Sequence, residues 1–234
     1  MAVLLSIIIP SHNEEKYIGN TLRHVLKQTM QRDKYEIIVS DAHSTDATFK
    51  VAKKYADKVL LADTHNAAEG RNYGAKYAKG KILLFLDADT LLGKESLTRI
   101  EEFINKGYGG GTFTLLGQES NFVDKLSLKI LEIIEILSAY VGIAYTNGSC
   151  TFVTREGFDK THGFNPKIDV GEDNDFIRRV SKFYKTGLIK YYAEISLRRI
   201  HRKGWIPLYW LWAKSFFKSL FSREIKNKEY WEDR

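Results

Sequence analysis

The stretch ILLFLDAD at residues 82–89 decides the fold, because it reads as a buried strand that ends in two aspartates. Its apolar run shows no polar alternation, which is typical of a strand covered on both faces in a parallel sheet. Asp87 and Asp89 follow at once, and on extended backbone residues i and i+2 point to the same side. Two carboxylates placed in this way can hold a hard divalent cation and leave positions open for phosphate oxygens.

Similar apolar runs surround this stretch. They lie at residues 4–9, 36–40 and 59–61. Segments with helical spacing separate them, at residues 14–30, 45–55 and 67–78. Alternation of strands and helices predicts right-handed crossovers and a parallel sheet, whose ligands bind at the carboxyl ends of the strands.

The second half of the chain is less regular. We expect helices at residues 94–105, 123–139, 172–184 and 205–225, and strands at 109–116, 150–154 and 195–200. The predicted fold class is α/β, a mostly parallel sheet flanked by helices, with a C-terminal amphipathic helical extension. We expect one domain over residues 1–200, and a basic and aromatic extension over 201–234 that packs on the domain or lies at a membrane surface.

Composition narrows the class of protein. The 234 residues include 44% hydrophobic ones, enough for a large core and too many for a disordered chain. Cys150 is the only cysteine, which excludes an intrachain disulfide and fits a reducing compartment. Charged residues interrupt the apolar segments at 126–145 and 205–221, so neither is expected to span a membrane. We expect a cytoplasmic protein, with the inner face of the cell membrane as a surface that it contacts peripherally.

The positive charge lies mainly in the tail. The whole chain has a net charge of +7, and residues 198–234 carry ten Lys or Arg against four Asp or Glu. This asymmetry indicates an anionic partner of the tail, either a phosphate-bearing ligand or an anionic membrane surface. A solvated basic helix face is the alternative explanation.

Polar and acidic residues also follow the first two strands. PSHNE at residues 10–14 follows the first, and DAHSTD at residues 41–46 follows the second. Neither G-x-G-x-x-G nor G-x-x-x-x-G-K-[ST] follows an early strand, which argues against a dinucleotide oxidoreductase and a P-loop enzyme.

These motifs together resemble the family 2 glycosyltransferases of the GT-A fold, over roughly residues 4–185. The matching pieces are IIIPSHNE at 7–14, VSDAHSTDAT at 39–48, RNYG at 71–74, LDAD at 86–89 and GEDND at 171–175. The second piece departs from the commoner family form, which has a second Asp and then Gly where this chain has Ala42 and His43.

The resemblance implies an enzyme that moves a sugar from a nucleotide diphosphate donor, with inversion, to a hydroxyl or lipid-phosphate acceptor. A UDP-sugar is the favoured donor and a GDP-sugar the alternative. The implied cofactor is Mg²⁺ or Mn²⁺. The expected acceptor is a glycan or, because of the basic and aromatic tail, a lipid-linked molecule, and nucleic acid is not an expected partner.

The resemblance also implies roles for single residues. Those expected to bind the nucleotide-sugar are Pro10, Asn13, Glu14, Asp41, Arg71, Asp87 and Ala88. Asp89 would bind the metal, Asp173 would be the general base, and Glu172 would orient that base or contact the acceptor. Acidic residues also favour the first turn of a helix without any catalysis, because of the helix dipole.

The basic segment at residues 198–205 allows two interpretations. By analogy with related enzymes it folds over the donor, with His201 as a further metal ligand and Arg202 or Lys203 against the diphosphate. Alternatively it anchors the tail to anionic lipid, because aromatic residues and lysines follow it on a helix too short and too charged to span a bilayer.

Two other functions remain open from the sequence. A sugar-phosphate nucleotidyltransferase shares the sheet architecture, but it usually has a glycine-rich and basic loop after the first strand, unlike residues 10–14. A non-enzymatic membrane-binding or nucleic-acid-binding protein would use the basic tail. Such a protein does not need acidic residues at three strand ends, because carboxylates repel phosphate backbones.

Overall fold

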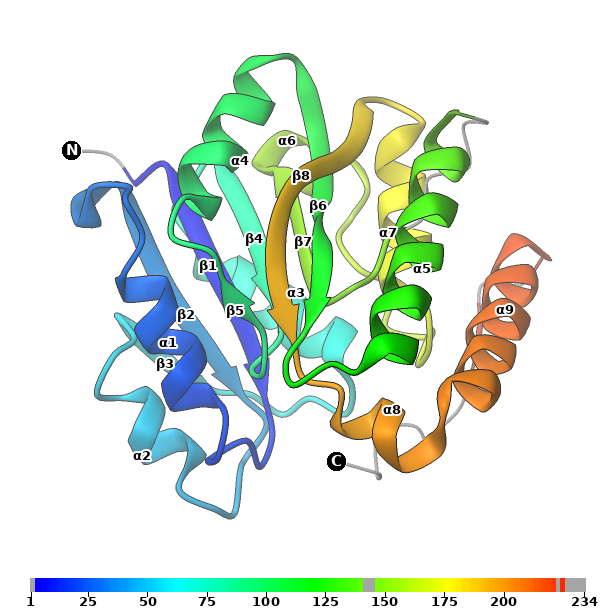
Figure 1. The fold of residues 1–234 in the computed structure, drawn as a ribbon. Helices are drawn as coiled ribbons and strands as arrows, with labels where there is room; N and C mark the ends of the chain where they lie inside the picture. Colours follow the sequence, from blue (N-terminus) through cyan, green and yellow to red (C-terminus); the bar gives the residue numbers. More distant parts are fainter. Residues whose placement is uncertain (1–2, 141–145, 222–223, 226–234) are drawn as a thin grey trace.

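A single mixed sheet organises the molecule, and it follows from the apolar runs of the sequence. The computed structural model describes residues 3–140, 146–221 and 224–225. Its eight described strands have the order β3-β2-β1-β4-β7-β6-β8-β5 (Figure 1). The strands are β1 (Leu5–Ser11), β2 (Tyr35–Asp41), β3 (Lys58–Leu61), β4 (Ile82–Leu86), β5 (Leu91–Leu92), β6 (Tyr108–Gly117), β7 (Cys150–Thr154) and β8 (Lys185–Ile195).

The sheet is mostly parallel, as the sequence predicts. β1 pairs in parallel with β2 and with β4, and β8 pairs in parallel with β6. Among the described strands only β5 and β7 run antiparallel to their neighbours. The register of β1 with β2 brings Ser11 opposite Asp41, and that of β4 with β7 brings Leu86 opposite Cys150. The carboxyl ends of β1, β2 and β4 and the amino end of β7 therefore meet at one edge.

Helices cover both faces of the sheet. They are α1 (Ile18–Leu26), α2 (Thr48–Ala52), α3 (Ala67–Lys76), α4 (Ser96–Asn105), α5 (Phe122–Tyr140), α6 (Arg155–Lys160), α7 (Glu172–Ser181), α8 (Arg198–Lys203) and α9 (Trp205–Phe221), with a 3₁₀ turn at Arg32–Lys34. Alternate residues of β1 enter different cores: Ile7 and Ile9 pack with α1 and α4, whereas Ile8 packs with α3 and α7. Burial on both faces explains why β1, β2 and β4 are continuously apolar.

The last strand and the helix after it correct the sequence analysis. The strand expected at residues 195–200 is wrong: β8 runs over Lys185–Ile195 and α8 begins at Arg198. Leu197 and Ile200 are three residues apart, and both are buried against Leu208 of α9, which is helical spacing. The short helix α6 was also not expected.

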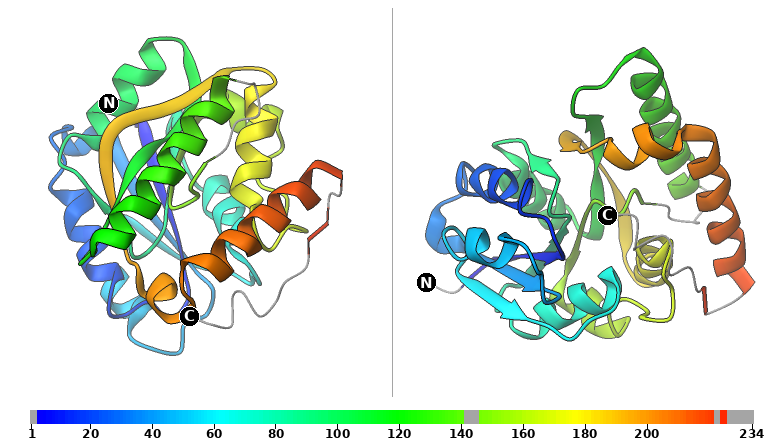
Figure 2. Two further views of the ribbon diagram at one scale, coloured as in Figure 1. Left: turned by 45° about the vertical axis from the view of Figure 1, so that its right-hand side comes forward. Right: turned by 90° about the horizontal axis from the view of Figure 1, so that it is seen from below.

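Helix α5 packs beside β6 and β8, and α9, which follows α8, lies at the outside of the molecule (Figures 1 and 2). The hydroxyl of Tyr209 on α9 donates a hydrogen bond to the carbonyl of Ser127 on α5, at 2.8 Å. The helix expected at 205–225 is described as far as Phe221, and the side chains of Leu220 and Phe221 lie outside the described part. Within the described residues, none of the helices combines the length and the hydropathy that a membrane crossing requires.

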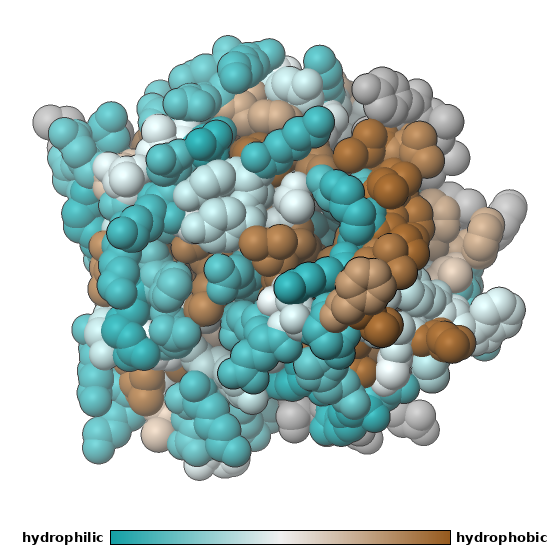
Figure 3. All heavy atoms as spheres, in the orientation of Figure 1, coloured by the Kyte–Doolittle hydropathy of each residue, from teal (hydrophilic) through white to brown (hydrophobic). Residues whose placement is uncertain are grey.

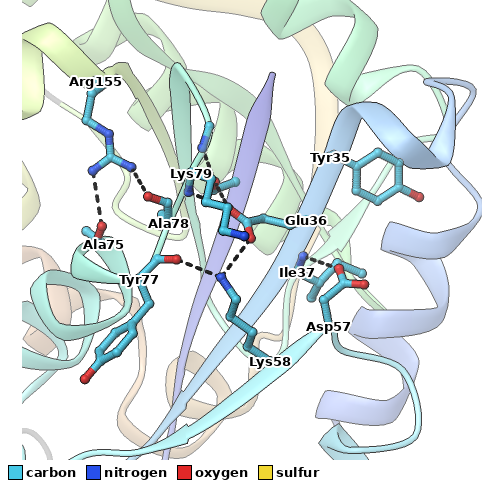
Figure 4. A network of polar contacts seen from close by, with 12 residues as sticks. Tyr35, Glu36, Ile37, Asp57, Lys58, Ala75, Tyr77, Ala78, Lys79 and Arg155 are labelled. Atoms are coloured by element: carbon cyan, nitrogen blue, oxygen red, sulfur yellow. Dashed lines mark hydrogen bonds and ion pairs between the residues drawn. The ribbon is translucent and has the colours of Figure 1, made fainter. Parts of the chain in front are cut away.

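A polar network fixes the opposite edge of the sheet, where the parallel strands begin (Figure 4). The buried carboxylate of Glu36 accepts hydrogen bonds from the Ser6 hydroxyl, the Lys79 amide and the Lys58 ammonium group. Lys58 also donates to the carbonyl of Tyr77. This network connects the starts of β1, β2 and β3 to the turn before β4, at the edge of the sheet opposite the carboxyl ends of the parallel strands.

Candidate active site

A cavity of about 190 Å³ lies at the carboxyl edge of the sheet. The ends of β1, β4 and β8, the start of α7, and α5, α8 and α9 all contribute to its walls. The structure brings together eight of the residues proposed from the sequence, which line this cavity: Pro10, Glu14, Arg71, Asp87, Ala88, Asp89, Glu172 and Asp173.

A buried arginine connects the two acidic motifs. Arg71 is 3% exposed, and its guanidinium donates to Glu172 Oε1 at 2.6 Å and to Asp87 Oδ1 at 3.0 Å. Burial alone would lower the pKa of Arg71, but the carboxylates around it outweigh this and raise it, so the side chain stays charged. A buried charge of this kind needs its partners, so Arg71 fixes the end of β4 against the start of α7.

Asp173 lies in the first turn of α7. Gly171, just before this helix, has a left-handed backbone conformation. The net pKa of Asp173 is raised to about 7. Burial is the largest cause, the negative charge of Glu172 adds to the rise, and Arg71 opposes it. Gly148 also has a positive φ, and a Cβ at this position would come within 2.2 Å of Asp173 Oδ2. The close approach therefore requires glycine. A carboxylate with a pKa near neutrality is suited to act as a general base.

Among the described cations of the tail, Arg198 and Arg199 line the cavity, and sequence reasoning had selected neither of them. Arg198 contacts acidic residues there. Its Nη2 donates to Glu14 Oε1 at 2.7 Å and lies 3.2 Å from Asp89 Oδ2. The other oxygen of Glu14, Oε2, is buried without a hydrogen-bond partner. Arg198 could not be identified as a cavity residue from the sequence. Its position in the first turn of α8 depends on where β8 ends, at Ile195.

Arg202 and His201 do not line the cavity, which differs from the expectation. Arg202 is exposed, and Arg199 lines the cavity instead, because both arginines at the start of α8 face it. The His201 ring contacts Asp124 of α5, with 3.0 Å between Nε2 and Oδ2. Burial raises the pKa of Asp124, but hydrogen bonds from His201 and Trp205 outweigh this effect, so the net pKa is below its usual value. This group joins α5 to α8 and α9.

Two strand-end residues also lie away from the cavity lining. Asp41 is fully buried, and its carboxylate accepts hydrogen bonds from the Ser11 hydroxyl and from the hydroxyl and amide of Ser44. Asn13 has a positive φ, and its side-chain oxygen accepts from the Thr45 amide at 2.9 Å. Both side chains hold together the loops that follow β1 and β2.

Glu135 is an acidic group of the cavity that the sequence analysis had not proposed for the site. It is 5% exposed and lines the cavity from α5, and its Oε1 has no hydrogen-bond partner. Burial raises its pKa well above the usual value, an Asn147 hydrogen bond opposes this, and the negative charge of Asp173 adds to it. The signal available in the sequence was a carboxylate on the apolar side of an amphipathic helix.

One part of the cavity wall is mostly apolar, although Glu135 of α5 also lies in it. It is formed by side chains of α5 and α9 together with neighbours from β6 and the loop before α7: Leu115, Leu128, Leu131, Val170, Leu208 and Trp212. The cavity thus has a charged side, at the ends of β1 and β4, and a hydrophobic side.

The acidic residues fit a divalent cation that a ligand helps to hold. The described residues contain no group of three His, Cys, Asp or Glu side chains arranged to hold a metal alone. Mg²⁺ is commonly bound by one or two carboxylates together with substrate phosphates. Asp89 and the unpartnered oxygen of Glu14 supply such carboxylates at the charged side.

Sequence comparison identifies relatives of this chain. The family described as "Glycosyl transferase family 2" matches residues 6–161. Poly(ribitol-phosphate) beta-N-acetylglucosaminyltransferase TarS of Staphylococcus aureus is 36% identical over 107 residues, which are 43% of this chain and 19% of that protein. A poly(ribitol-phosphate) beta-glucosyltransferase of Bacillus spizizenii is 38% identical over 106 residues, 42% of this chain and 17% of that protein. The matched part is thus under a fifth of either relative.

Comparison of structures agrees on the fold. S. aureus TarS 1-349 in complex with UDP-GlcNAc superposes with a TM-score of 0.70 at 21% identity, covering 83% of this chain and 58% of that one. Mannosyltransferase PcManGT from Pyrobaculum calidifontis, in complex with GDP-Man and Mn2+, has a TM-score of 0.69 at 17% identity, covering 95% of this chain and 71% of that one. Because the family match extends over more than half of the sequence, the chain belongs to glycosyl transferase family 2, and its fold is the GT-A fold of the structural neighbours.

Proposed function

We propose that this protein is a metal-dependent, inverting glycosyltransferase in which Asp173 is the general base. The observation that carries the proposal is the Asp173 carboxyl group, whose pKa is raised to about 7 in the cavity that also holds Asp87 and Asp89. An acceptor hydroxyl is a poor nucleophile, and a carboxylate within reach accelerates its attack by typically ~10²–10⁴-fold.

The reaction is a single displacement. The acceptor oxygen forms a bond to the anomeric carbon, the bond from that carbon to the diphosphate oxygen breaks, and the hydroxyl proton moves to Asp173. The nucleoside diphosphate leaves with the electron pair. Arg71 binds Glu172, and the negative charge of Glu172 adds to the rise in the pKa of the neighbouring Asp173, which Arg71 itself opposes. One displacement gives inversion and needs no protein nucleophile.

Asp89, with Glu14 beside it, would hold Mg²⁺ or Mn²⁺ at the charged side of the cavity. When bound, the cation supplies positive charge that stabilises the leaving diphosphate. Arg198 lies against the same two carboxylates and adds a fixed positive charge there. Asp87, Ala88 and Pro10 complete the proposed donor side.

A UDP-sugar is the favoured donor and a GDP-sugar the alternative. One structural neighbour was solved with UDP-GlcNAc and another with GDP-Man and Mn2+. For the acceptor, we favour a hydroxyl of a glycan or lipid-linked molecule over a lipid phosphate. A phosphate is already ionised at neutral pH and needs no base, whereas the cavity contains a carboxyl group suited to take a proton.

Calorimetric titration of UDP and of GDP tests the donor site, each with Mn²⁺, Mg²⁺ or EDTA. We expect one nucleotide to bind only with the cation, and Asp89→Ala to weaken that binding at least tenfold. Asp63→Ala is the matched control, because Asp63 is an exposed aspartate that does not line the cavity. Equal binding by wild type and Asp89→Ala, or binding that EDTA leaves unchanged, would contradict the assignment of the metal site.

A further inference from the structure

A band of exposed hydrophobic side chains runs along the outer face of α5, at the right of Figure 3. Its members are Phe122, Val123, Leu126, Ile130, Ile133, Ile134 and Leu137, each more than two-fifths exposed. At 3.6 residues per turn these positions fall within about 120° of the helix circumference. The opposite side of α5 carries the buried residues Leu128, Leu131 and Glu135 of the cavity wall.

The neighbouring helix α9 repeats this arrangement. Ile206, Trp210 and Phe217 are 83%, 75% and 62% exposed, and they lie within about 60° of the circumference. Leu208 and Ser215 on the other side of α9 are buried and line the cavity. Each helix therefore presents one side to the cavity and a hydrophobic side to the outside.

Lysines flank both hydrophobic faces. Lys125 and Lys129 follow one edge of the α5 band, and Lys214 and Lys218 follow one edge of the α9 stripe, each pair four residues apart. All four are exposed. Helices with an apolar face, aromatic residues and flanking lysines, too short and charged to cross a bilayer, are typical of proteins that lie in the membrane interface.

We propose that the outer faces of α5 and α9 form one docking surface for an anionic phospholipid bilayer. The charges decide between a bilayer and a second copy of the chain. A twofold contact places the same patch on both partners, so a second copy would bring four more exposed lysines to the interface. An anionic lipid surface instead attracts each lysine near it by about 1 kcal/mol.

The inference is independent of the donor and of the chemistry proposed above. Its consequence is geometric: the two helices that would rest on lipid also form the hydrophobic wall of the cavity, through Leu128, Leu131 and Leu208. Docking would therefore hold that wall beside the bilayer.

Flotation with vesicles tests the docking surface. The probes are vesicles of phosphatidylcholine alone and of an equimolar mixture with phosphatidylglycerol, without nucleotide or metal. We expect the protein to float with the anionic vesicles and much less with the neutral ones. The double variant Ile206→Gln, Trp210→Gln should bind at least about tenfold more weakly, because two large apolar side chains no longer enter the interface.

Two further variants complete the design. Lys214→Gln with Lys218→Gln should weaken binding to anionic vesicles by about tenfold or more. Leu61→Gln is the matched control, since Leu61 is an exposed apolar residue on β3, away from both helices, and it should bind like wild type. All these positions are exposed, so unchanged circular dichroism is expected and verifies folding.

Either of two results would overturn the proposal. The first is the absence of wild-type binding to anionic vesicles at low salt. The second is a wild-type dimer in light scattering that the Ile206→Gln, Trp210→Gln variant converts to a monomer, because a second copy would then cover this surface.

Discussion

Asp173 shows how far a single residue can be understood from the sequence. The resemblance to the family 2 glycosyltransferases implied that Asp173, in an acidic helix start after Gly171, is the general base. Its raised pKa could not be predicted, because it arises from burial and from Glu172 in a geometry that Arg71 fixes. The same holds for Gly148, which only the folded chain brings against Asp173.

The raised pKa predicts the pH dependence of sugar transfer. Below pH 7 the Asp173 carboxyl group is increasingly protonated and cannot accept the hydroxyl proton, so kcat/KM should rise with pH through about 7 and then level off. In Asp173→Asn we expect kcat to fall by ~10²–10⁴-fold and this rise to disappear. Steady-state rates across the neutral range measure both effects.

Asp159→Asn is the control for this series, because Asp159 is an exposed aspartate on α6. It should retain the wild-type rate and profile. A wild-type profile that stays flat through neutral pH would contradict Asp173 as the base, as would near-normal transfer by Asp173→Asn.

At the scale of elements, the continuous apolar runs of β1, β2 and β4 were sufficient to predict those strands, since each is buried on both faces. β8 was not predicted, because most of its side chains are not buried. Only Ile189 and Ala193 of its residues are buried, and its register with β6 shifts between Phe113 and Thr114, so no regular period marks it. Its end in turn determined where α8 begins.

The network around Glu36 carries a prediction about how the strands are held together. Burial raises the pKa of Glu36, but hydrogen bonds from Lys79, Ser6 and Lys58 outweigh this, so the net pKa is lowered. A lowered pKa in the folded state stabilises the fold above the unfolded-state value near 4.3, and this stabilisation is lost as the pH falls through the folded-state value.

Glu36→Gln should therefore reduce the free energy of unfolding by about 1–3 kcal/mol at pH 7, because a buried charge-assisted network is broken. The difference from wild type should narrow as the solution becomes acidic. Urea unfolding at several pH values measures it, and the exposed Glu102→Gln should show little change. A difference that grows toward acid pH would refute the assignment.

At the scale of the whole molecule, the sequence predicted a phosphate-bearing ligand or an anionic membrane surface as the partner of the basic tail, and this stays a prediction. The structure places one arginine of the tail against carboxylates of the body. Arg198 on α8 joins Glu14, after β1, and Asp89, after β4. These residues are far apart in the chain, so neither their pairing nor the choice among the arginines of residues 198–202 could be read from local pattern.

Removing this connection should make stability depend on divalent cations. In Arg198→Ala the buried Glu14 carboxylate loses its partner, and because Arg198 is about one-third exposed we expect a modest loss of about 1–2 kcal/mol in EDTA. Mn²⁺ should restore more of the melting temperature in this variant than in wild type. Thermal unfolding with EDTA or Mn²⁺ measures both changes.

Arg99→Ala is the matched control, because Arg99 forms an exposed ion pair with Glu95 on α4. Its melting temperature should stay close to that of wild type in both conditions. Identical melting of Arg198→Ala and wild type in EDTA would show that Arg198 does not balance the charge of Glu14 and Asp89.

The backbone pairing of Ile225 has a consequence for how the protein matures during translation. Ile225 forms a parallel bridge with Ile168, through hydrogen bonds to Lys167 and Asp169, in the loop that leads into α7. The strands β1 to β4 can associate early, because their contacts are close in sequence. The loop before the proposed base gains this partner only after residue 225 has left the ribosome, so a nascent chain that has emerged only as far as β8 would present the strands of the sheet without this support for the loop.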